Sequence, residues 1–416
     1  MNRDILFLCH RVPFPPDRGD KIRSFHILKA LAALGRVHLL TFADDDADAA
    51  HADGLARWVA STSVIVRRRG RARAAVSAVL SGKPVSLTLF DAAAMRLAAA
   101  RLFAQQRFDV VYAFSGQMAQ FVPPDADARF LMDFVDVDSA KFDGYAATAG
   151  PLWRRINARE GRLLARYEGQ MAERADLSLF VSGAEAALFR ERHPGVGDRV
   201  MALENGIDCD RFRPDAVLPP LPPLPPLPPL PRGNGPLLLF TGQMDYAPNV
   251  EAVDGFARGV FPAIRSGFPT ARFVIVGRAP VPAVQALAML PGVEVTGTVP
   301  DVRPWLAAAD VVVAPLKLAR GIQNKVLEAM AMGRAVVASP AAQEGIDVEP
   351  GRHLIVAGPE RQADAVRALL SDPVRRASLG RAARARMVER YGWDQVLAPL
   401  ARMTSGAANP AAIAAE

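Results

Sequence analysis

The chain has 416 residues, half of them apolar, and a formal net charge of +7. This length exceeds one ordinary hydrophobic core and predicts at least two domains, and the apolar content excludes disorder over most of the chain. The two cysteines, Cys9 and Cys209, argue against a disulfide framework and against a cysteine-based zinc site. The positive charge favours anionic partners such as nucleotides or phospholipid surfaces.

The first half of the chain alternates short apolar runs with helical patterns such as that of Ser24–Leu34. Most of the runs are continuously apolar, which is typical of strands buried on both faces of a parallel sheet. In this half we predict strands at Asp4–His10, Arg36–Phe42, Val64–Val66, Val110–Ala113, Phe130–Phe134, Leu177–Val181 and Val200–Leu203.

A repeated Leu-Pro-Pro pattern at Leu218–Pro231 divides the chain into nearly equal halves. Proline removes backbone donors and fixes φ, so this segment cannot join a helix or an interior strand. We predict an extended polyproline II linker, and the alternative is a ligand for an SH3-type domain.

The second half repeats the alternation of strand and helix. We predict strands at Leu237–Thr241, Arg272–Val276, Val293–Thr296, Val311–Ala314, Ala335–Ala338 and His353–Val356. The fold class is therefore α/β, with two doubly wound Rossmann-like domains that face a central cleft and bind ligands at the carboxyl ends of their strands. The predicted boundaries are 1–215 for the N-terminal domain, 216–235 for the linker, 236–390 for the C-terminal domain and 391–416 for a C-terminal helix and frayed tail.

Polar loops follow three predicted strands of the N-terminal half. Gly19 and Asp20 lie in a loop rich in proline and glycine, where glycine would let the backbone approach a ligand. An ordinary strand–helix turn explains this loop equally well, and we expect its helix to start near residues 22–24. Ser115 follows a second strand in the same way.

The third loop carries Asp133, Asp136 and Asp138. Carboxylates at close spacing repel one another unless a cation or a turn relieves them. We interpret this cluster either as part of a substrate site or as turn and cap chemistry.

Glycine and polar residues also end strands of the second half, as Gly242-Gln243 and Gly277-Arg278 do. Asn249 is predicted to cap the helix that follows the first of these loops. Both loops are expected to line the same edge of the C-terminal domain.

Ala314–Ala331 reads as a strand, a loop and a helix. Backbone amides from Gly321 onward would lie at the helix start, where amides and the helix dipole favour a diphosphate, and Lys325 adds a cation. Glu328, one turn further, can accept hydrogen bonds from ribose hydroxyls. The spacing fits an exposed ion pair between Lys325 and Glu328 equally well.

Taken together, these motifs resemble the retaining GT-B glycosyltransferases of glycosyltransferase family 4 over almost the whole chain. The motifs that carry the resemblance are the Gly19 loop, Glu204–Asp208, Gly242–Asn249, Val276–Arg278 and Gly321–Ala331. Two further segments, Phe7–Arg23 and Asp133–Ser139, resemble the branch associated with exosortase/PEP-CTERM systems and exopolysaccharide loci.

The resemblance implies a nucleotide-diphosphate sugar bound mainly by the C-terminal domain, an acceptor on the N-terminal domain and transfer with retention, without an obligatory metal. Glu328 would hold the ribose, and Lys325 with the amides near Gly321 would hold the diphosphate. Many relatives carry a glutamate eight positions before Glu328. Here that position is Arg320, which could contact phosphate or an acidic sugar instead.

The candidate residues fall into three groups. The predicted donor-binding residues are Gly242, Gln243, Gly277, Arg278, Arg320, Gly321, Ile322, Lys325 and Glu328. The predicted catalytic residues are Asp136, Lys325 and Arg278, of which the two cations would stabilise the leaving diphosphate. The residues predicted to face the acceptor or the sugar are Gly19, Asp20, Ser115 and Asp133. We expect no cofactor and no metal.

The expected partners are the nucleotide-sugar donor and a saccharide or lipid-linked acceptor. Arg67–Arg73 is either a solvated loop or a contact with an anionic membrane surface, and it lacks the aromatic residues that would stack nucleic-acid bases. No apolar run is long enough for a signal peptide or a membrane span, so we expect a cytoplasmic protein or one at the inner face of the membrane.

Two other functions fit the same sequence. One is a GT-B-type nucleotide-sugar epimerase, with His10, His26 and the Asp133–Asp138 cluster as acid–base groups. The other is a non-catalytic nucleotide-sugar-binding protein that docks through its proline-rich segment.

Overall fold

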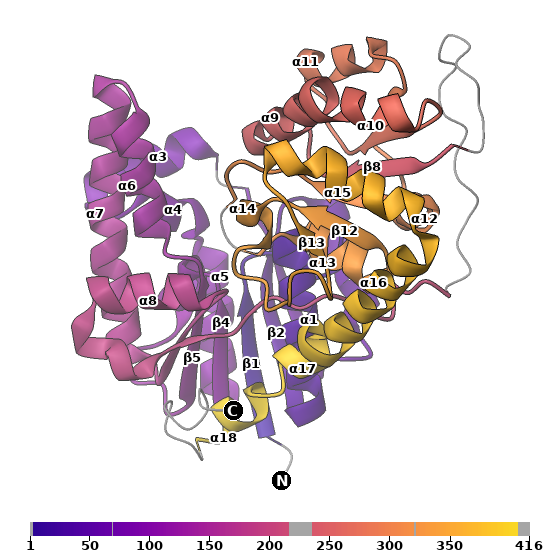
Figure 1. Ribbon diagram of the computed structural model, residues 1–416. Coiled ribbons are helices and arrows are strands. Elements are labelled where there is room, and N and C mark those ends of the chain that lie inside the picture. The colour runs from indigo at the N-terminus through magenta and orange to yellow at the C-terminus, as the bar shows by residue number, and fades with distance from the viewer. Residues whose placement is uncertain (1–2, 69, 216–234, 320–321, 407–416) are drawn as a thin grey trace. The chain divides into compact units, whose positions relative to one another are not determined.

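The computed structural model describes residues 3–68, 70–215, 235–319 and 322–406 (Figure 1). The chain divides into two compact domains, an N-terminal domain of residues 1–205 with 396–416 and a C-terminal domain of residues 206–395. This division differs from the predicted boundaries because the chain returns at its end to the N-terminal domain, where α18 (Leu400–Ser405) packs against α1 (Gly19–Leu34) and β5 (Arg129–Val135). The predicted linker at Leu218–Pro231 lies outside the described residues.

The described part of the N-terminal domain contains a seven-stranded parallel sheet with the order β3-β2-β1-β4-β5-β6-β7. The strands are β1 (Arg3–Cys9), β2 (Gly35–Ala43), β3 (Ser61–Val66), β4 (Val110–Phe114), β5 (Arg129–Val135), β6 (Leu177–Phe180) and β7 (Val200–Ala202). All strands predicted for this half are confirmed, and residues 5–9 of β1 have no exposed surface, as their unbroken apolar run indicates.

Helices connect the strands of this domain. The α-helices are α1 (Gly19–Leu34), α2 (Asp46–Ala50), α3 (Arg71–Ser81), α4 (Val85–Phe90), α5 (Ala93–Gln105), α6 (Asp138–Thr148), α7 (Pro151–Arg174), α8 (Gly183–Arg192) and α18 (Leu400–Ser405). Short 3₁₀ turns are η1 (His51–Leu55), η2 (Gly116–Phe121) and η3 (Pro194–Arg199). The helices α6 and α7 lie side by side, as Figure 1 shows.

The C-terminal domain contains a six-stranded parallel sheet with the order β10-β9-β8-β11-β12-β13. Its strands are β8 (Leu237–Thr241), β9 (Arg272–Val276), β10 (Val293–Gly297), β11 (Val311–Ala314), β12 (Ala335–Ala338) and β13 (Ile355–Val356). Its helices are α9 (Ala247–Gly255), α10 (Phe261–Gly267), α11 (Pro282–Gln285), α12 (Arg303–Ala308), α13 (Asn324–Ala331), α14 (Pro340–Gln343), α15 (Pro359–Ser371), α16 (Pro373–Arg386) and α17 (Trp393–Val396), with short 3₁₀ or π turns η4 (Phe256–Val260), η5 (Ala286–Met289) and η6 (Met387–Tyr391).

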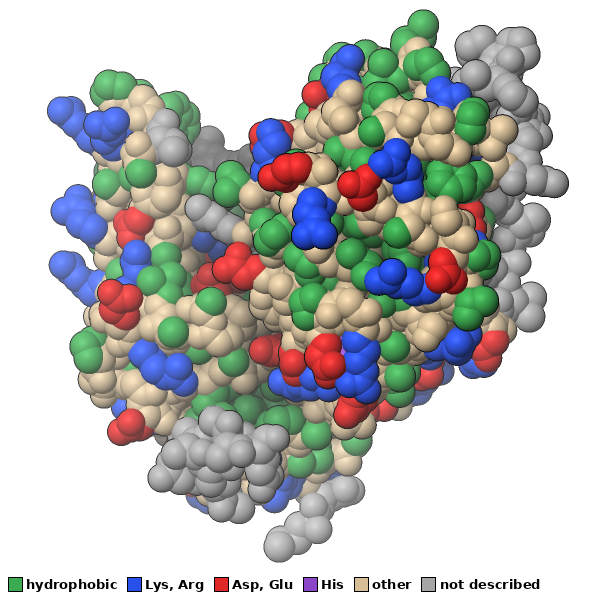
Figure 2. All heavy atoms as spheres, viewed as in Figure 1, with side chains coloured by type: hydrophobic (Ala, Val, Ile, Leu, Met, Phe, Trp, Pro, Cys, Tyr) green, Lys and Arg blue, Asp and Glu red, His purple; other side chains and the backbone are tan. Residues whose placement is uncertain are grey.

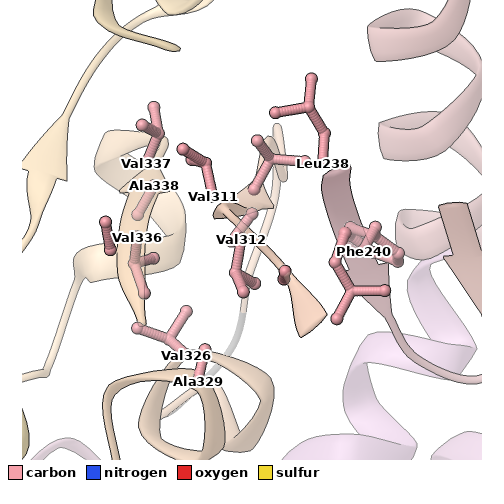
Figure 3. Packing of buried hydrophobic residues seen from close by; sticks show 14 of the residues in the cluster. Leu238, Phe240, Val311, Val312, Val326, Ala329, Val336, Val337 and Ala338 are labelled. Atoms are coloured by element: carbon pink, nitrogen blue, oxygen red, sulfur yellow. The ribbon is translucent and has the colours of Figure 1, made fainter. Parts of the chain in front are cut away.

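The packing of α13 fixes the direction of its polar side chains. Val326 and Ala329 are fully buried and face strand side chains such as Val336 (Figure 3). Residues three apart share one face of a helix, so the burial of this pair leaves Lys325 and Glu328 together on another face.

The strand order places a crevice in each sheet. From β8 the chain moves outward through β9 to β10 and then returns to β11 on the other side of β8. In the N-terminal domain the same reversal lies between β1 and β4. Ligands of open α/β sheets bind beyond the carboxyl ends of the strands at such a reversal, so each domain has a defined position for a site.

Candidate active site

Two glycines allow the loops after β8 and β9 to touch at the crevice of the C-terminal domain. A Cβ atom on Gly277 would lie 1.6 Å from the carbonyl oxygen of Gly242. A Cβ atom on Gly242 would lie 2.8 Å from the side-chain nitrogen of Asn249 and 3.3 Å from the Nζ atom of Lys325. At Gly277 a side chain would force the backbone to move, whereas at Gly242 it would displace the side chains of Asn249 and Lys325. Both glycines are half-buried, and the main chain of Gly242 therefore lies close to a cation.

Lys325 lies at the first turn of α13 and is held by a side chain from the first turn of α9. Its Nζ atom donates a hydrogen bond to Oδ1 of Asn249 at 2.5 Å and lies 4.4 Å from the centre of the Phe240 ring. The side-chain nitrogen of Asn249 donates to the carbonyl oxygen of Gln243 at 2.9 Å. Asn249 thus orients the ammonium group. The prediction that it caps α9 is wrong, because the N-cap residue of that helix is Tyr246.

The amino end of α13 has no side-chain cap among the described residues. Helix-start amides without a cap are donors for an anion, and the helix dipole adds to their attraction. The predicted donor residues Arg320 and Gly321 lie just before this helix, outside the described residues, and their roles stay predictions. Ile322 is half-buried and packs against the core of the domain.

Glu328 is half-buried, and its carboxylate has no hydrogen-bond partner among the described residues. The nearby Lys325 donates to Asn249, so the pair does not form the simple surface ion pair that the spacing also allowed. Burial raises the pKa of Glu328 to about 7, although the charges of Arg211 and Lys325 oppose this shift. Burial lowers the pKa of Lys325 to about 8, against the attraction of Glu328. Both groups are poised to change charge near neutral pH.

Arg278 and Gln243, which the sequence places in separate loops, meet in the structure. An Nη atom of Arg278 donates to the side-chain oxygen of Gln243 at 2.9 Å, and both side chains are exposed. The backbone of Arg278 also accepts a hydrogen bond from the amide of Met244 at 2.9 Å. The guanidinium group is therefore held at the same sheet edge as Lys325, as predicted for both loops.

In the N-terminal domain, a chain of ion pairs follows the carboxyl ends of β1 and β2. An Nη atom of Arg11 lies 2.7 Å from Asp20, and its Nε atom lies 2.8 Å from Asp44. The Nε2 atom of His10 lies 3.4 Å from Asp20. Burial alone would raise the pKa of Asp20, but contacts with His10 and Arg11 lower it well below its usual range. Arg11 was not among the predicted site residues, and His10 was named only as an acid–base group of the alternative epimerase.

The helix α1 begins at Gly19, three to five residues earlier than predicted. Asp20 therefore lies in the first turn of α1, where an acidic side chain interacts favourably with the helix dipole. A Cβ atom on Gly19 would meet no atom within 4 Å. Protein packing thus does not require glycine at this position, and the predicted role of its backbone toward a ligand stays a prediction.

Ser115 follows β4 and lies across the sheet reversal from His10. Its φ is +76°, and Val135 at the end of β5 has a φ of +72°. Positive φ values are unusual for residues other than glycine, and most of all for a β-branched residue such as Val135. Residues with such backbone strain concentrate at functional sites. His10 stacks on Phe114, with ring centres 5.6 Å apart, so β1 and β4 bring one polar group each to this crevice.

Asp133 does not face solvent in the structure. It is fully buried, and its Oδ2 atom accepts hydrogen bonds from Arg23 at 2.9 Å and Tyr112 at 2.7 Å. Arg23 in turn donates to the carbonyl of Glu204 and to the side chain of Asn205, both at 3.1 Å. Through these contacts Asp133 of β5 links β4, α1 and the segment after β7. Its role in the structure is therefore to stabilise the N-terminal domain.

Asp136 is half-buried and pairs with a lysine of the following helix. The Nζ atom of Lys141 lies 2.7 Å from Asp136 and 3.1 Å from Asp138. Although burial opposes it, the two carboxylates raise the pKa of Lys141. The repulsion expected in the aspartate cluster is therefore relieved by cations, Lys141 for these two residues and Arg23 for Asp133.

Within the described ranges no group of three or more histidine, cysteine or acidic residues could hold a metal ion. Within the same ranges, each helix is too short or too polar to cross a bilayer.

The comparisons with known proteins agree on the fold. Residues 235–372, most of the C-terminal domain, match the model of a family described as glycosyl transferases group 1. No curated protein sequence matches the chain. Sucrose-phosphate synthase from Thermosynechococcus elongatus is 18% identical, with a TM-score of 0.64 over 98% of this chain and 100% of that chain.

Two more solved structures are similar over their whole lengths. HepE from Anabaena in complex with UDP-glucose is 15% identical, with a TM-score of 0.64 over 97% of this chain and 100% of that chain. A glycosyltransferase from Rickettsia africae is 13% identical, with a TM-score of 0.62 over 97% and 98%. The chain therefore has the α/β fold of the GT-B glycosyltransferases, with two Rossmann-like domains, as the sequence predicts.

Proposed function

We propose that this protein is a glycosyltransferase that moves a sugar from a nucleoside-diphosphate sugar to a saccharide acceptor, with retention and without an obligatory metal. The observation that carries the proposal is the position of Lys325. It is a cation, oriented by Asn249, at a helix start that has no side-chain cap within the described part of the chain, and it lies close to the main chain of Gly242. This arrangement suits a diphosphate, and the family match at residues 235–372 supports the same assignment.

The proposed chemistry breaks the bond between the anomeric carbon and the diphosphate and forms a bond from that carbon to an acceptor hydroxyl oxygen. The diphosphate leaves with the bonding electron pair and takes up the acceptor's proton. Lys325 and Arg278 would stabilise the charge of the leaving diphosphate, because fixed cations act where charge develops. Glu328 in its ionised form would accept hydrogen bonds from the ribose. The solved HepE structure with UDP-glucose supports this class of donor.

The acceptor would lie at the N-terminal crevice, near Ser115, Asp20 and His10, with Asp136 as the proposed catalytic carboxylate. The resemblance of Phe7–Arg23 to the exosortase/PEP-CTERM branch supports a role in exopolysaccharide synthesis. A saccharide carried by a lipid is the acceptor that this role requires.

An exposed apolar surface on α3 and α7 supports contact with a membrane that would supply such an acceptor. Leu152 and Trp153 on α7 and Leu80 on α3 are 68%, 63% and 84% exposed. An Nη atom of Arg159 on α7 donates to the carbonyl of Ala78 on α3, so the two helices adjoin. Figure 2 shows lysine and arginine side chains along the edge that α7 forms. Apolar and aromatic residues beside cations favour anionic lipid surfaces.

The predicted arginine run contributes less to this surface than its sequence indicates. Arg67 pairs with Asp44 at 2.6 Å and lies over the ring of Phe90, so its charge is already engaged. Arg68 is exposed. Arg69 lies outside the described residues, and the structure does not describe the side chains of the last two arginines of the run.

The experiment that tests the function incubates the purified protein with a panel of nucleotide sugars and a lipid-linked saccharide. Mass spectrometry of the acceptor then detects transfer, and NMR of the product gives the anomeric configuration. We expect the acceptor to gain the mass of one sugar, with the configuration of the donor. Conversion of the donor to its epimer without any gain on the acceptor would contradict the proposal and favour the epimerase.

A further inference from the structure

A pocket of about 410 Å³ lies in the C-terminal domain, away from the candidate donor site. It is lined by Asp310, just before β11, and by Arg334, just before β12. These positions are the amino-terminal edge of the sheet, whereas Gly242, Gly277 and Lys325 lie at the carboxyl edge. The pocket therefore does not belong to the site described above.

Four arginines and one carboxylate line this pocket. The cations are Arg334, Arg376, Arg381 and Arg384, and the carboxylate is that of Asp310. Asp310 is already occupied, because one oxygen accepts the amide of Leu237 at 2.9 Å and the other lies 3.0 Å from Arg376. The lining thus has an excess of positive charge that its own residues do not neutralise.

Part of this charge has a structural role. Arg384 donates to the carbonyl oxygens of Phe212, Ala331 and Cys209. Arg376 donates to the carbonyl of Leu369 at 3.1 Å in addition to its contact with Asp310. Arginines that cap the carboxyl ends of helices in this way stabilise the domain without any ligand.

Within the described part of the chain, some donors of the pocket arginines have no protein partner. Each guanidinium carries five N–H groups. The Nε and Nη1 atoms of Arg334 donate to the carbonyls of Met332 and Ala309 at 3.2 and 3.4 Å, and its Nη2 atom has no partner in the described ranges. Arg381 lines the pocket but is exposed, and it has no hydrogen-bond or ion-pair partner among the described residues. Burial and the like charge of Arg376 lower the pKa of Arg334, and Asp310 opposes this only in part.

We propose that this pocket binds the phosphate group of a phosphorylated small molecule, as a second anion site separate from the donor site. The planar fork of a guanidinium matches two phosphate oxygens, and a bound dianion would offset the repulsion between Arg334 and Arg376. The volume suits a small metabolite rather than a macromolecule. The mainly backbone partners of Arg384 and Arg376 hold the lining in place before any ligand enters.

The test measures the binding of inorganic pyrophosphate to the full-length protein by isothermal titration calorimetry. The variants are Arg381→Gln, the double variant Arg376→Gln/Arg381→Gln, and Arg375→Gln as a matched control, since Arg375 is an exposed arginine of α16 outside the pocket lining. Lys325→Ala separates this site from the donor site. Circular dichroism checks that each variant is folded.

We expect a pyrophosphate site that persists in Lys325→Ala and Arg375→Gln, weakens several-fold in Arg381→Gln and weakens at least tenfold in the double variant. If the double variant does not fold, the single variant Arg381→Gln is the deciding test, because this exposed side chain makes no hydrogen bond or ion pair within the described residues. Wild-type affinity in Arg381→Gln would overturn the proposal, and so would binding that disappears entirely with Lys325. These outcomes do not depend on whether the protein transfers a sugar.

Discussion

The Nζ atom of Lys325 lies 2.5 Å from the side-chain oxygen of Asn249, although the two residues are 76 positions apart. Asn249 also holds the carbonyl of Gln243, so a single amide joins the loop after β8 to the start of α13. The cation is thereby fixed before a donor binds, and less side-chain freedom is lost on binding.

Donor binding should depend on pH through Lys325 and Glu328. The ammonium form of Lys325 is needed for the diphosphate and is lost above its pKa of about 8. The ionised form of Glu328 is needed for the ribose and is lost below its pKa of about 7. The affinity for a nucleoside diphosphate, measured by calorimetry from about pH 5.5 to 9.5, should therefore be highest between these values.

The two limbs of this profile can be separated. Glu328→Gln should remove the fall on the acid side and keep the fall on the alkaline side, at a lower overall affinity. A profile for Glu328→Gln that is identical in shape to the wild-type profile would show that another group titrates.

Gly277→Ala should destabilise the C-terminal domain, because its methyl group would overlap the carbonyl of Gly242. We expect a loss of about 3 kcal/mol or more in the free energy of unfolding, as for other forced backbone shifts in packed regions. Gly255→Ala is the control, since a Cβ atom there meets nothing within 4 Å and the backbone is helical. It should gain about 0.5 kcal/mol. Urea denaturation measures both, and equal effects would refute the steric argument.

Asp133→Asn should cost about 3 kcal/mol of stability, because it leaves the buried charge of Arg23 without its carboxylate. Asp136→Asn should cost less than about 1 kcal/mol, since its partner Lys141 is partly exposed. Because Asp136 is the proposed catalytic carboxylate, Asp136→Asn should nevertheless lose transfer activity. Thermal unfolding and an activity assay on the same two samples separate the roles, and full activity in Asp136→Asn would remove this residue from the mechanism.

The apolar surface of α3 and α7 should bind vesicles that contain anionic phosphatidylglycerol. Replacing Leu152 and Trp153 by serine should reduce co-sedimentation with such vesicles about tenfold or more, because both side chains are exposed. Leu97→Ser, at an exposed leucine of α5, is the matched control. Equal binding by the three proteins would exclude this surface as the membrane contact.

The sequence predicts the sheets well because their strands are buried on both faces, so each apolar run is unbroken. It also predicts where β8 and β9 end, because the first glycine or polar residue after an unbroken apolar run marks the carboxyl end of the strand. Gly242, Gly277 and Lys325 could therefore be assigned to one edge without the structure.

Contacts between distant segments could not be predicted in this way. Nothing local to Asn249 shows that its side chain turns to Lys325, and a polar residue near a helix start is more often a cap. Asp133 stands in an apparently polar run, yet its partner Arg23 is 110 positions away. His10 and Asp20 become neighbours only because α1 begins at Gly19 and folds back beside β1.

The most direct test of the account compares nucleoside-diphosphate binding by the wild-type protein, Lys325→Ala and Lys317→Ala. Lys317 is the matched control, an exposed lysine between β11 and α13 whose Nζ atom lies 2.8 Å from Glu251. Calorimetry with UDP, GDP and ADP should show at least one tight ligand, a loss of affinity of about a hundredfold in Lys325→Ala and little change in Lys317→Ala. Unchanged affinity in Lys325→Ala, or an equal loss in both variants, would contradict the assignment of the donor site.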